Sequence, residues 1–272
     1  MDTIFKLEDV HYSYLGRFPA LRGIDLEIHK GEKIAFLGAN GTGKSTLLQI
    51  LDGLIFPDSG RVTAFGRKLT EDAFSDREFN HSFRKNVGFV FQNPDIQLFC
   101  PTVREDILFG PLQLGFDQAE ALARMEEVTS FLEIGHLLDR SPNQLSIGEK
   151  RKVAIASTLA IDPEVIILDE PTAGLDPATT RHIIDRMNLA SESGKTIITS
   201  THDLHIVEEI ADSIFVFGKE KRIIRSGPAS ELLRDMEFLS ANNLVHVHSH
   251  RHHGTLHTHT HQHLEHHHGH EK

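Results

Sequence analysis

The chain has 272 residues and a formal net charge of −11, because 28 Lys and Arg residues stand against 39 Asp and Glu residues. This acidic balance argues against generic binding to nucleic acid or to an anionic membrane surface, since both select a basic face. The single cysteine, Cys100, excludes an internal disulfide and favours a reducing compartment, and no apolar run approaches the roughly 18 residues of a membrane-spanning helix.

The N-terminal part of the chain predicts three strands. Residues 4–10 and 24–28 alternate apolar and polar side chains, as half-buried antiparallel strands do. Residues 18–20 (Phe-Pro-Ala) and 22–23 (Arg-Gly) lie between them and predict a turn. Residues 34–37 form a continuous apolar run that ends in a glycine-rich loop, which is typical of a buried parallel strand.

That glycine-rich loop, residues 38–45, fits the pattern G-x-x-x-x-G-K-[ST] and precedes a predicted helix over 46–53. In this context the glycines let backbone N–H groups surround phosphate oxygens, and the helix N-terminus adds positive potential. Lys44 is expected to reach the β- and γ-phosphates of ATP, and Ser45 to ligate Mg²⁺. The predicted nucleotide contacts are Gly38, Ala39, Asn40, Gly41, Thr42, Gly43, Lys44, Ser45 and Thr46.

The middle of the chain, from about 96 to 160, shows helical patterns and no clear buried strand, and we interpret it as an inserted helical subdomain. Asp117 is expected to cap one of its helices. Apolar runs typical of buried strands then return at 165–168, 196–199 and 214–217. Strands that alternate with helices predict an α/β fold with a mainly parallel sheet.

Asp169 and Glu170 directly follow the apolar run at 165–168. In an open α/β sheet, ligands bind beyond the carboxyl ends of the strands, which places these carboxylates beside the phosphate loop. One carboxylate there can hold Mg²⁺, and the next can orient and activate the attacking water. We therefore predict that Asp169 and Ser45 bind Mg²⁺ and that Glu170 activates the water.

Histidine dominates the C-terminal part of the chain: of 20 histidines, 13 lie between residues 246 and 272. We predict an ordered domain over 1–240 and an unstructured, low-complexity tail over 241–272. Neutral imidazole suits Ni²⁺, Co²⁺ and Zn²⁺, so the tail is a candidate metal-binding segment; a tag or a polar tail without function are the alternatives. The candidate ligands are His246, His248, His250, His252, His253, His257, His259, His261, His263, His266, His267, His268 and His270.

A further motif lies at residues 145–149, Leu-Ser-Ile-Gly-Glu, where Ser146 and Glu149 form a capping box at a predicted helix start. Together with the phosphate loop and the Asp169-Glu170 pair, it resembles the ATP-binding-cassette family. There, an L-S-G-G-Q segment presents its helix N-terminus to the γ-phosphate bound by a second subunit. Ser146 and Gly148 match that motif, whereas Ile147 replaces its first glycine and Glu149 its glutamine.

The same resemblance implies roles for four more residues. Tyr14 matches the aromatic residue that stacks on adenine, and Gln92 matches the glutamine that senses Mg²⁺ or the γ-phosphate and links to the membrane partner. Asp176 matches a residue that crosses the dimer interface, and His202 matches the switch histidine at the γ-phosphate. The resemblance covers roughly residues 1–225 and implies a P-loop ATPase fold with N-terminal antiparallel strands.

Within that family, residues 91–99, 102–107 and 109–111 are similar to the energy-coupling-factor group, and the Ser-x-Gly-Glu-Lys motif and the histidine-rich tail to its nickel and cobalt branch. This implies an ATPase subunit that works as a homodimer or heterodimer, bound to integral membrane subunits at the cytoplasmic face of the cell membrane. A vitamin or other small molecule is the alternative substrate. A soluble ATP-binding-cassette protein without a transport role is the rival class, although such proteins usually carry tandem cassettes.

Overall fold

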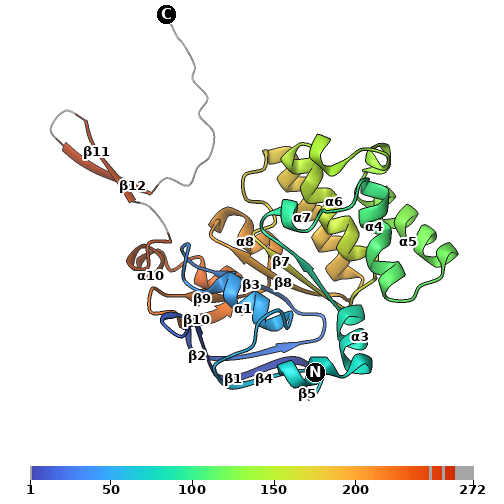
Figure 1. Cartoon of the computed structure of the whole chain (residues 1–272). Helices are drawn as coiled ribbons and strands as arrows, with labels where there is room; N and C mark the ends of the chain where they lie inside the picture. The colour runs from blue at the N-terminus through green and yellow to red at the C-terminus, as the bar shows by residue number, and fades with distance from the viewer. Residues whose placement is uncertain (1, 245–246, 253–254, 261–272) are drawn as a thin grey trace, which may run out of the picture.

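The computed structural model describes residues 2–244, 247–252 and 255–260 (Figure 1). The predicted antiparallel strands near the N-terminus are confirmed, and they belong to a four-stranded sheet, sheet A, in the order β2-β1-β4-β5. In β1, Phe5 and Leu7 are buried and Lys6 between them is exposed, as the sequence pattern requires, and Ile4 is buried as well. The strands of sheet A are β1 (Thr3–Tyr14), β2 (Phe18–His29), β4 (Ser59–Ala64) and β5 (Arg67–Lys68).

The turn between β1 and β2 differs from the prediction. The chain reverses at Leu15 and Gly16, which have φ angles of +54° and +64°, and residues 18–23 already lie in β2. Two successive residues with positive φ match the twist of a tight hairpin. Pro19 fits inside a strand because β2 is at the edge of sheet A, where a missing N–H interrupts few ladder bonds.

Sheet B has six strands in the order β10-β9-β3-β8-β7-β6, all parallel except the edge strand β10. The apolar runs predicted as buried parallel strands all lie here, so the predicted α/β fold class is confirmed. The strands are β3 (Lys33–Leu37), β6 (Val87–Val90), β7 (Val165–Asp169), β8 (Thr196–Thr201), β9 (Ser213–Phe217) and β10 (Ile223–Pro228).

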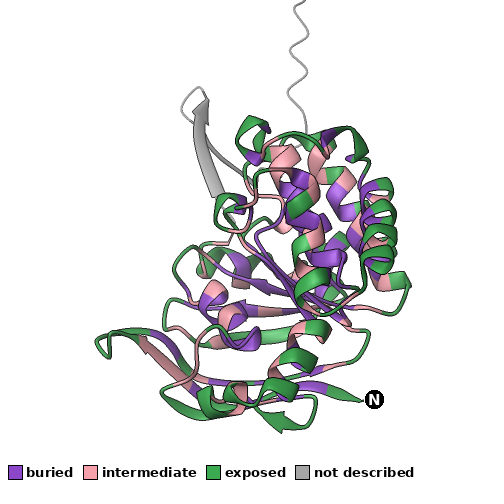
Figure 2. Cartoon of the chain, turned by 45° about the vertical axis from the view of Figure 1, so that its right-hand side comes forward, coloured by how far each residue is buried: buried purple, intermediate pink, exposed green. Residues whose placement is uncertain are grey.

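Sheet B is the middle layer of the molecule and contributes to a core on each of its faces. On β3, Ala35 and Leu37 join one hydrophobic cluster, whereas Ile34 and Phe36 join the other. The buried residues in Figure 2 accordingly concentrate on the strands and on the inner faces of the helices. This double burial explains why these strands are continuous apolar runs in the sequence.

Helix α1 (Lys44–Leu51) contributes its buried leucines to the cluster that sheet A and sheet B share. Helices α4 (Val103–Gln113), α5 (Gln118–Phe131) and α6 (Ile147–Leu159) occupy the segment that we expected to be helical, and this segment contains no strand. Asp117 caps α5 in a capping box with Glu120. The remaining helices are α2 (Glu71–Ser75), α3 (Arg77–Asn86), α7 (Pro177–Glu192), α8 (Leu204–Ile210), α9 (Ala229–Leu232) and α10 (Met236–Ala241).

The C-terminal region differs from the prediction in two ways. Leu244 still packs against the core, so the ordered body extends past residue 240. Strands β11 (Val247–His252) and β12 (Thr255–Thr260) then pair as an antiparallel ribbon, where we expected no regular structure. Alternating valine, threonine and histidine residues permit such a ladder. Residues 245–246, 253–254 and 261–272, with eight of the thirteen tail histidines, lie outside the described residues.

Candidate active site

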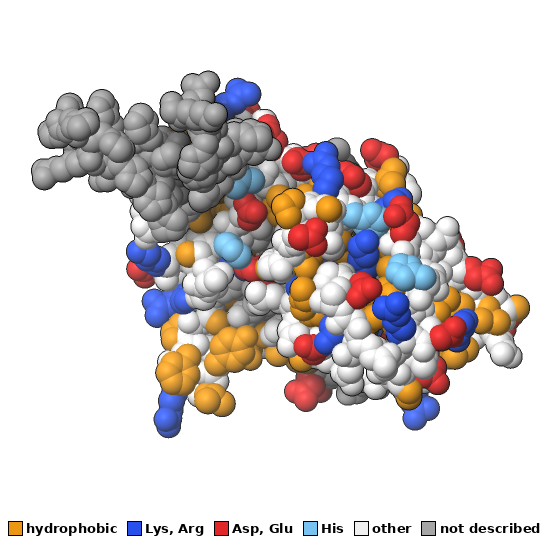
Figure 3. Space-filling view, turned by 90° about the horizontal axis from the view of Figure 1, so that it is seen from above, with side chains coloured by type: hydrophobic (Ala, Val, Ile, Leu, Met, Phe, Trp, Pro, Cys, Tyr) orange, Lys and Arg blue, Asp and Glu red, His pale blue; other side chains and the backbone are white. Residues whose placement is uncertain are grey.

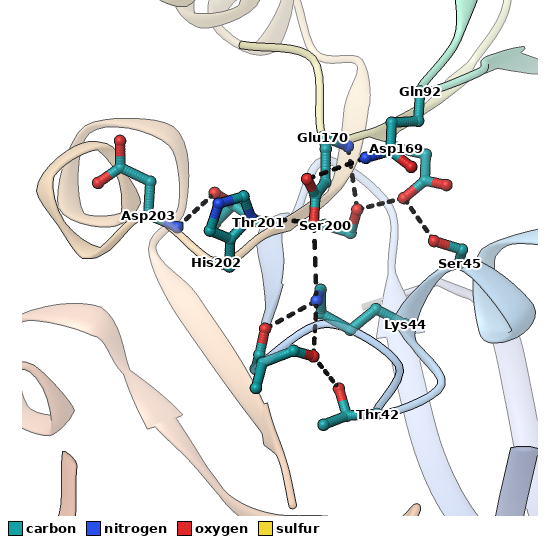
Figure 4. Close-up of polar contacts among 12 residues, drawn as sticks. Thr42, Lys44, Ser45, Gln92, Asp169, Glu170, Ser200, Thr201, His202 and Asp203 are labelled. Atoms are coloured by element: carbon teal, nitrogen blue, oxygen red, sulfur yellow. Dashed lines mark hydrogen bonds and ion pairs between the residues drawn. The ribbon is translucent and has the colours of Figure 1, made fainter. Parts of the chain in front are cut away.

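The predicted residues of the phosphate loop, the Asp169-Glu170 pair, Gln92 and His202 meet at one edge of sheet B, where β3, β8 and β7 lie side by side (Figure 4). In the parallel register, Leu37 at the end of β3 is opposite Thr201, and Asp169 at the end of β7 is opposite Ser200. The carboxyl ends of the three strands therefore lie together. The loop after β3 is the phosphate loop, so this edge is where the fold places a ligand.

The phosphate loop needs glycine at its junction with α1. Gly43 has a φ of +111°, and a Cβ atom there would lie 2.3 Å from the carbonyl oxygen of Ala20. Any other side chain would displace the loop from the N-terminus of α1. The loop thus brings its backbone N–H groups to a helix N-terminus, which is a favourable place for phosphate oxygens.

Lys44 is almost completely buried at the centre of the loop. Its Nζ donates hydrogen bonds to the carbonyl oxygens of Gly38, at 2.7 Å, and Ala39, at 3.3 Å, and lies 3.7 Å from Oε1 of Glu170. Burial lowers the pKa of the Lys44 ammonium, and the carboxylates of Glu170 and Asp169 oppose that shift. A phosphate would replace neutral carbonyl partners with charged oxygens, which bind an ammonium more strongly.

Asp169 joins the loop to β8. Its Oδ1 accepts hydrogen bonds from the hydroxyls of Ser45, at 3.0 Å, and Ser200, at 2.5 Å. Hydroxyl and carboxylate oxygens are the ligands that Mg²⁺ prefers. Within the described residues no three His, Cys, Asp or Glu side chains cluster as a metal cage. The set fits Mg²⁺, because that ion binds through one or two protein oxygens together with phosphate and water.

Glu170 lies at the centre of the remaining contacts. Its Oε2 accepts a hydrogen bond from Nε2 of Gln92, at 3.2 Å, and its Oε1 lies 3.1 Å from Nδ1 of His202. Its backbone N–H donates to the Ser200 hydroxyl, at 3.0 Å. A cavity of about 240 Å³ opens beside Glu170 and His202 and is lined in part by the loop at 172–175. The predicted catalytic residues Gln92 and His202 thus both contact Glu170, the third, beside an open volume.

Tyr14 lies at the end of β1, and its hydroxyl is hydrogen-bonded to that of Thr46 on α1, at 3.1 Å. The ring is 41% exposed and packs edge-to-face against Tyr12, with 5.1 Å between centroids. A partly exposed aromatic face beside the phosphate loop suits stacking on a nucleobase.

Ser146, Gly148 and Asp176 form a second group, whose hydrogen bonds stay among the described residues of two neighbouring helix starts. Ser146 caps α6 in a capping box with Glu149, as predicted, while Asp176 caps α7 and accepts hydrogen bonds from Thr179. A Cβ atom at Gly148 would lie 3.2 Å from the Thr179 side chain. The hydrogen bonds of this group do not reach the phosphate loop.

Sequence reasoning missed Ser200, which links Asp169 to the backbone of Glu170. A polar residue at the end of a buried apolar strand was the available signal. Ser200 reaches Asp169 and Glu170 because β8 lies between β3 and β7. The spacing of the motifs along the sequence does not predict that strand order.

A family model described as an ABC transporter matches residues 21–173, which is more than half of the chain. The chain belongs to the ABC transporter family. As a member of it, the chain is an ATPase whose hydrolysis of ATP is coupled to transport.

Three known proteins resemble this ABC ATPase closely. The nickel import ATP-binding protein NikO of Rhodobacter capsulatus is 48% identical over 236 residues, covering 86% of this chain and 92% of NikO. The structure of cbiO1 from Clostridium perfringens, described as part of the ABC transporter complex cbiONQ, has a TM-score of 0.76 and 39% identity and covers 90% and 96% of the two chains. A dimeric, post-hydrolysis structure of the cassette MJ0796 bound to ADP and Pi has a TM-score of 0.74 and 30% identity, with coverages of 83% and 99%.

On the face shown in Figure 3, acidic and basic side chains are interspersed. In the part of the chain that the structure describes, no helix has the length and apolar composition to cross a bilayer.

Proposed function

We propose that this ABC ATPase is the energy-coupling subunit of a membrane importer for nickel or cobalt ions. The observation that carries the ATPase chemistry is the position of Glu170. Its two carboxylate oxygens contact Gln92 and His202 separately, and Oε1 lies 3.7 Å from the Lys44 ammonium. A carboxylate fixed beside a phosphate-binding lysine can accept a proton from water that attacks the γ-phosphate.

The residues of one chain divide this work. Lys44 exchanges the carbonyl oxygens of Gly38 and Ala39 for β- and γ-phosphate oxygens, and the Glu170 carboxylate orients the attacking water and takes its proton. His202, beside the same carboxylate, contacts the γ-phosphate and holds the water on the reacting side. Ser45 and Asp169, beside Gln92, would hold Mg²⁺, and the ion would neutralise phosphate charge when bound.

A second cassette completes the site. Ser146, Gly148 and Asp176 are held at the starts of α6 and α7, and their hydrogen bonds do not include phosphate-loop residues. Two copies, or this chain and a homologue, would place this group of one subunit against the ATP bound by Lys44 of the other. The dimeric cassette MJ0796 with ADP and Pi supports that arrangement.

The membrane subunits are expected to dock beside the segment that follows Gln92. Ile96 and Phe99 are 62% and 65% exposed, and Phe99 packs edge-to-face on Phe109 with 5.0 Å between ring centroids. A cavity of about 450 Å³ lies nearby, between α3 and the end of α4. Exposed aromatic side chains beside a hollow suit the insertion of a short partner segment. Such docking would hold this chain at the cytoplasmic face of the cell membrane.

The metal substrate is supported by the 48% identity to a nickel import protein and by the histidine-rich tail. Histidine alternates with other residues over much of this tail, and the strands β11 and β12 pair in a register that sets His248 opposite His259. Imidazole is a ligand that favours Ni²⁺, Co²⁺ or Zn²⁺. A vitamin importer is the second candidate, because residues 91–99 are similar to the wider energy-coupling-factor group.

Reconstitution tests the proposal. The chain is co-expressed with the membrane proteins encoded beside it, purified from membranes and inserted into vesicles. ATP, supplied on the side of the vesicle membrane where this chain is bound, should drive the transport of radioactive nickel or cobalt. A complex with the Glu170→Gln variant should not transport the metal. Uptake of a vitamin but no metal would overturn the substrate assignment, and failure to co-purify with any membrane protein would overturn the importer.

A further inference from the structure

The segment that begins at Gln92 is hydrogen-bonded to helix α6, which starts within the Leu-Ser-Ile-Gly-Glu motif. Arg151, in the second turn of α6, has a fully buried side chain, with 2% exposure. Its Nη1 donates to the carbonyl oxygen of Phe91 at 2.8 Å, and its Nη2 donates to that of Gln92 at 2.6 Å. The planar guanidinium of Arg151 therefore donates hydrogen bonds to two successive backbone carbonyls, just after β6 ends and where the segment begins.

This burial needs a reason, because a guanidinium out of water is costly unless an anion accompanies it. Among the described residues no carboxylate lies within ion-pair distance of Arg151, and its buried Nε has no hydrogen-bond partner. Burial lowers the pKa of Arg151, while the charges of Asp169 and Glu170 act in the opposite direction. The fold thus keeps an unpaired cation near the catalytic carboxylates, where a neutral side chain would pack at lower cost.

We propose that Arg151 is the positioning residue for Gln92: by holding the carbonyl oxygens of Phe91 and Gln92, it aims the Gln92 amide at Glu170. The other end of that link is the 3.2 Å hydrogen bond from Nε2 of Gln92 to Oε2 of Glu170. Arg151 lies on the helix that Ser146 caps. Any shift of α6 therefore reaches the water-activating carboxylate through Arg151 and Gln92. This last step depends on the proposed function, in which Ser146 binds the nucleotide of the opposite subunit.

Other contacts between α6 and the same segment differ in kind. Gln97 donates to the carbonyl oxygen of Ala154 at 2.8 Å, and Lys150 forms an ion pair with Asp95 at 2.6 Å. Gln97 also accepts a hydrogen bond from the backbone N–H of Phe91, at 3.2 Å, but neither Gln97 nor Lys150 contacts the backbone of Gln92. Arg151 alone among these residues acts at the carbonyl of Gln92 itself.

Arg151→Met keeps an unbranched apolar stem, lacks the guanidinium group and so removes both hydrogen bonds. We expect ATP affinity to stay within about twofold of wild type and kcat for hydrolysis to fall by about tenfold to a hundredfold, as for a misplaced catalytic group. Arg124→Met is the matched control, because Arg124 also donates to two carbonyls of α6, those of Leu159 and Ala160, but at the opposite end of the helix. It should lower thermal stability and leave kcat within about twofold.

A double-mutant cycle separates positioning from general damage. In the Gln92→Ala background, Arg151→Met should cause little further loss of kcat, because its effect passes through Gln92. Arg151→Lys, which retains one donor group, should give an intermediate kcat and serves as the readout where the methionine variant does not fold. If the double variant loses kcat by the product of the two single losses, Arg151 and Gln92 act independently and the proposal is overturned. An unchanged kcat in Arg151→Met would also overturn it. Absence of hydrolysis by the wild-type chain would instead overturn the proposed function.

Discussion

Glu170 is held from both sides of its carboxylate, and each contact comes from a different part of the chain. Gln92 follows β6 and His202 follows β8, while Lys44 begins α1. The carboxylate is 6% exposed, so few water molecules compete for its oxygens. At the scale of single residues, the site is therefore a set of side chains fixed in advance around the position that we propose for the attacking water.

The variant Glu170→Gln tests this arrangement most directly. The amide keeps the size of the carboxylate but cannot accept the proton of water, so ATP binding should persist while kcat falls by about a hundredfold or more. ATP-dependent dimers should accumulate and be visible by light scattering. Glu164→Gln, which alters a surface ion pair with Lys30, is the control and should hydrolyse ATP normally. Substantial hydrolysis by Glu170→Gln would show that another group activates the water.

Lys44→Ala tests the phosphate loop. The substitution removes the buried ammonium that would bind the β- and γ-phosphates, so ATP affinity should fall by at least roughly tenfold, the usual size of a charge-assisted hydrogen bond, and hydrolysis should vanish. Lys33→Ala on the neighbouring strand, which lies 3.7 Å from Asp212, is the matched control. A nucleotide titration that gives equal affinities for wild type and Lys44→Ala would contradict the assigned loop.

At the scale of elements, α1 is fixed at both of its ends. Lys44 begins it in the site, and at its other end Asp52 is fully buried and accepts a hydrogen bond from Nη1 of Arg84 on α3, at 3.1 Å. Burial raises the pKa of Asp52 to about 7, and Arg84 opposes the shift. The helix that presents the phosphate loop is thus joined to α3 through a titrating carboxyl.

This carboxyl predicts a specific pH dependence of stability. The folded chain holds the Asp52 proton up to about pH 7, whereas the unfolded chain releases it near pH 4, so the free energy of unfolding should fall as pH rises between these values. The loss is at most about 4 kcal/mol. Urea unfolding of wild type and Asp52→Asn at pH 5 and pH 8 measures it, because other titrating groups cancel in the comparison. Identical pH dependence in both proteins would contradict the prediction.

Elements with strong local signals could be predicted from the sequence. The strands of sheet B are buried on both faces and are therefore unbroken apolar runs, and the caps at Asp117 and Ser146 satisfy backbone N–H groups close to them in the chain. Elements with weak local signals were not predicted. Strand β4 buries only Val62 and Ala64, and β10 is an edge strand that has no buried residue and ends in Gly-Pro. Helix α3 did carry a signal, the Asp76 cap before Phe79 and Phe83.

The site itself could be predicted only in part, for a related reason. The sequence motifs were sufficient to predict Lys44, Asp169 and Glu170 as site residues. Contacts across the sheet, in contrast, depend on the order of the strands. Ser200 and Arg151 act through such contacts and belong to no motif that we identified. Physical neighbours that are distant in sequence thus remained hidden until the fold was available.

At the scale of the whole molecule, we propose that the tail and the ATPase body are separable. Leu244 packs on the core, whereas the described residues of β11 and β12 pair with each other. All of the site residues described above precede the tail in the chain. The acidic charge also belongs to the body, because the tail from 245 onward carries Arg251 and Lys272 against Glu265 and Glu271.

Deletion of residues 245–272 should therefore leave thermal unfolding and basal ATP hydrolysis unchanged. The full-length chain should bind several Ni²⁺ or Co²⁺ ions by calorimetric titration, with affinity weakening as pH falls through about 6.5, where histidine becomes protonated. The truncated chain should lose this binding, and cells that carry it should take up less metal when metal is scarce. Equal metal binding by the two proteins would contradict the role of the tail, and unaltered uptake would make it a passive chelator.

Glu170 has an unfavourable backbone conformation. Its φ of +47° is in the left-handed region, which glycine and asparagine tolerate far better than a long acidic side chain. Such a conformation costs on the order of 1 kcal/mol, and the rest of the edge must hold it in place. Folding alone would select a different amino acid at position 170. Under the proposed function, the position is therefore a compromise in which a less stable polypeptide keeps the proposed base directed at the attacking water.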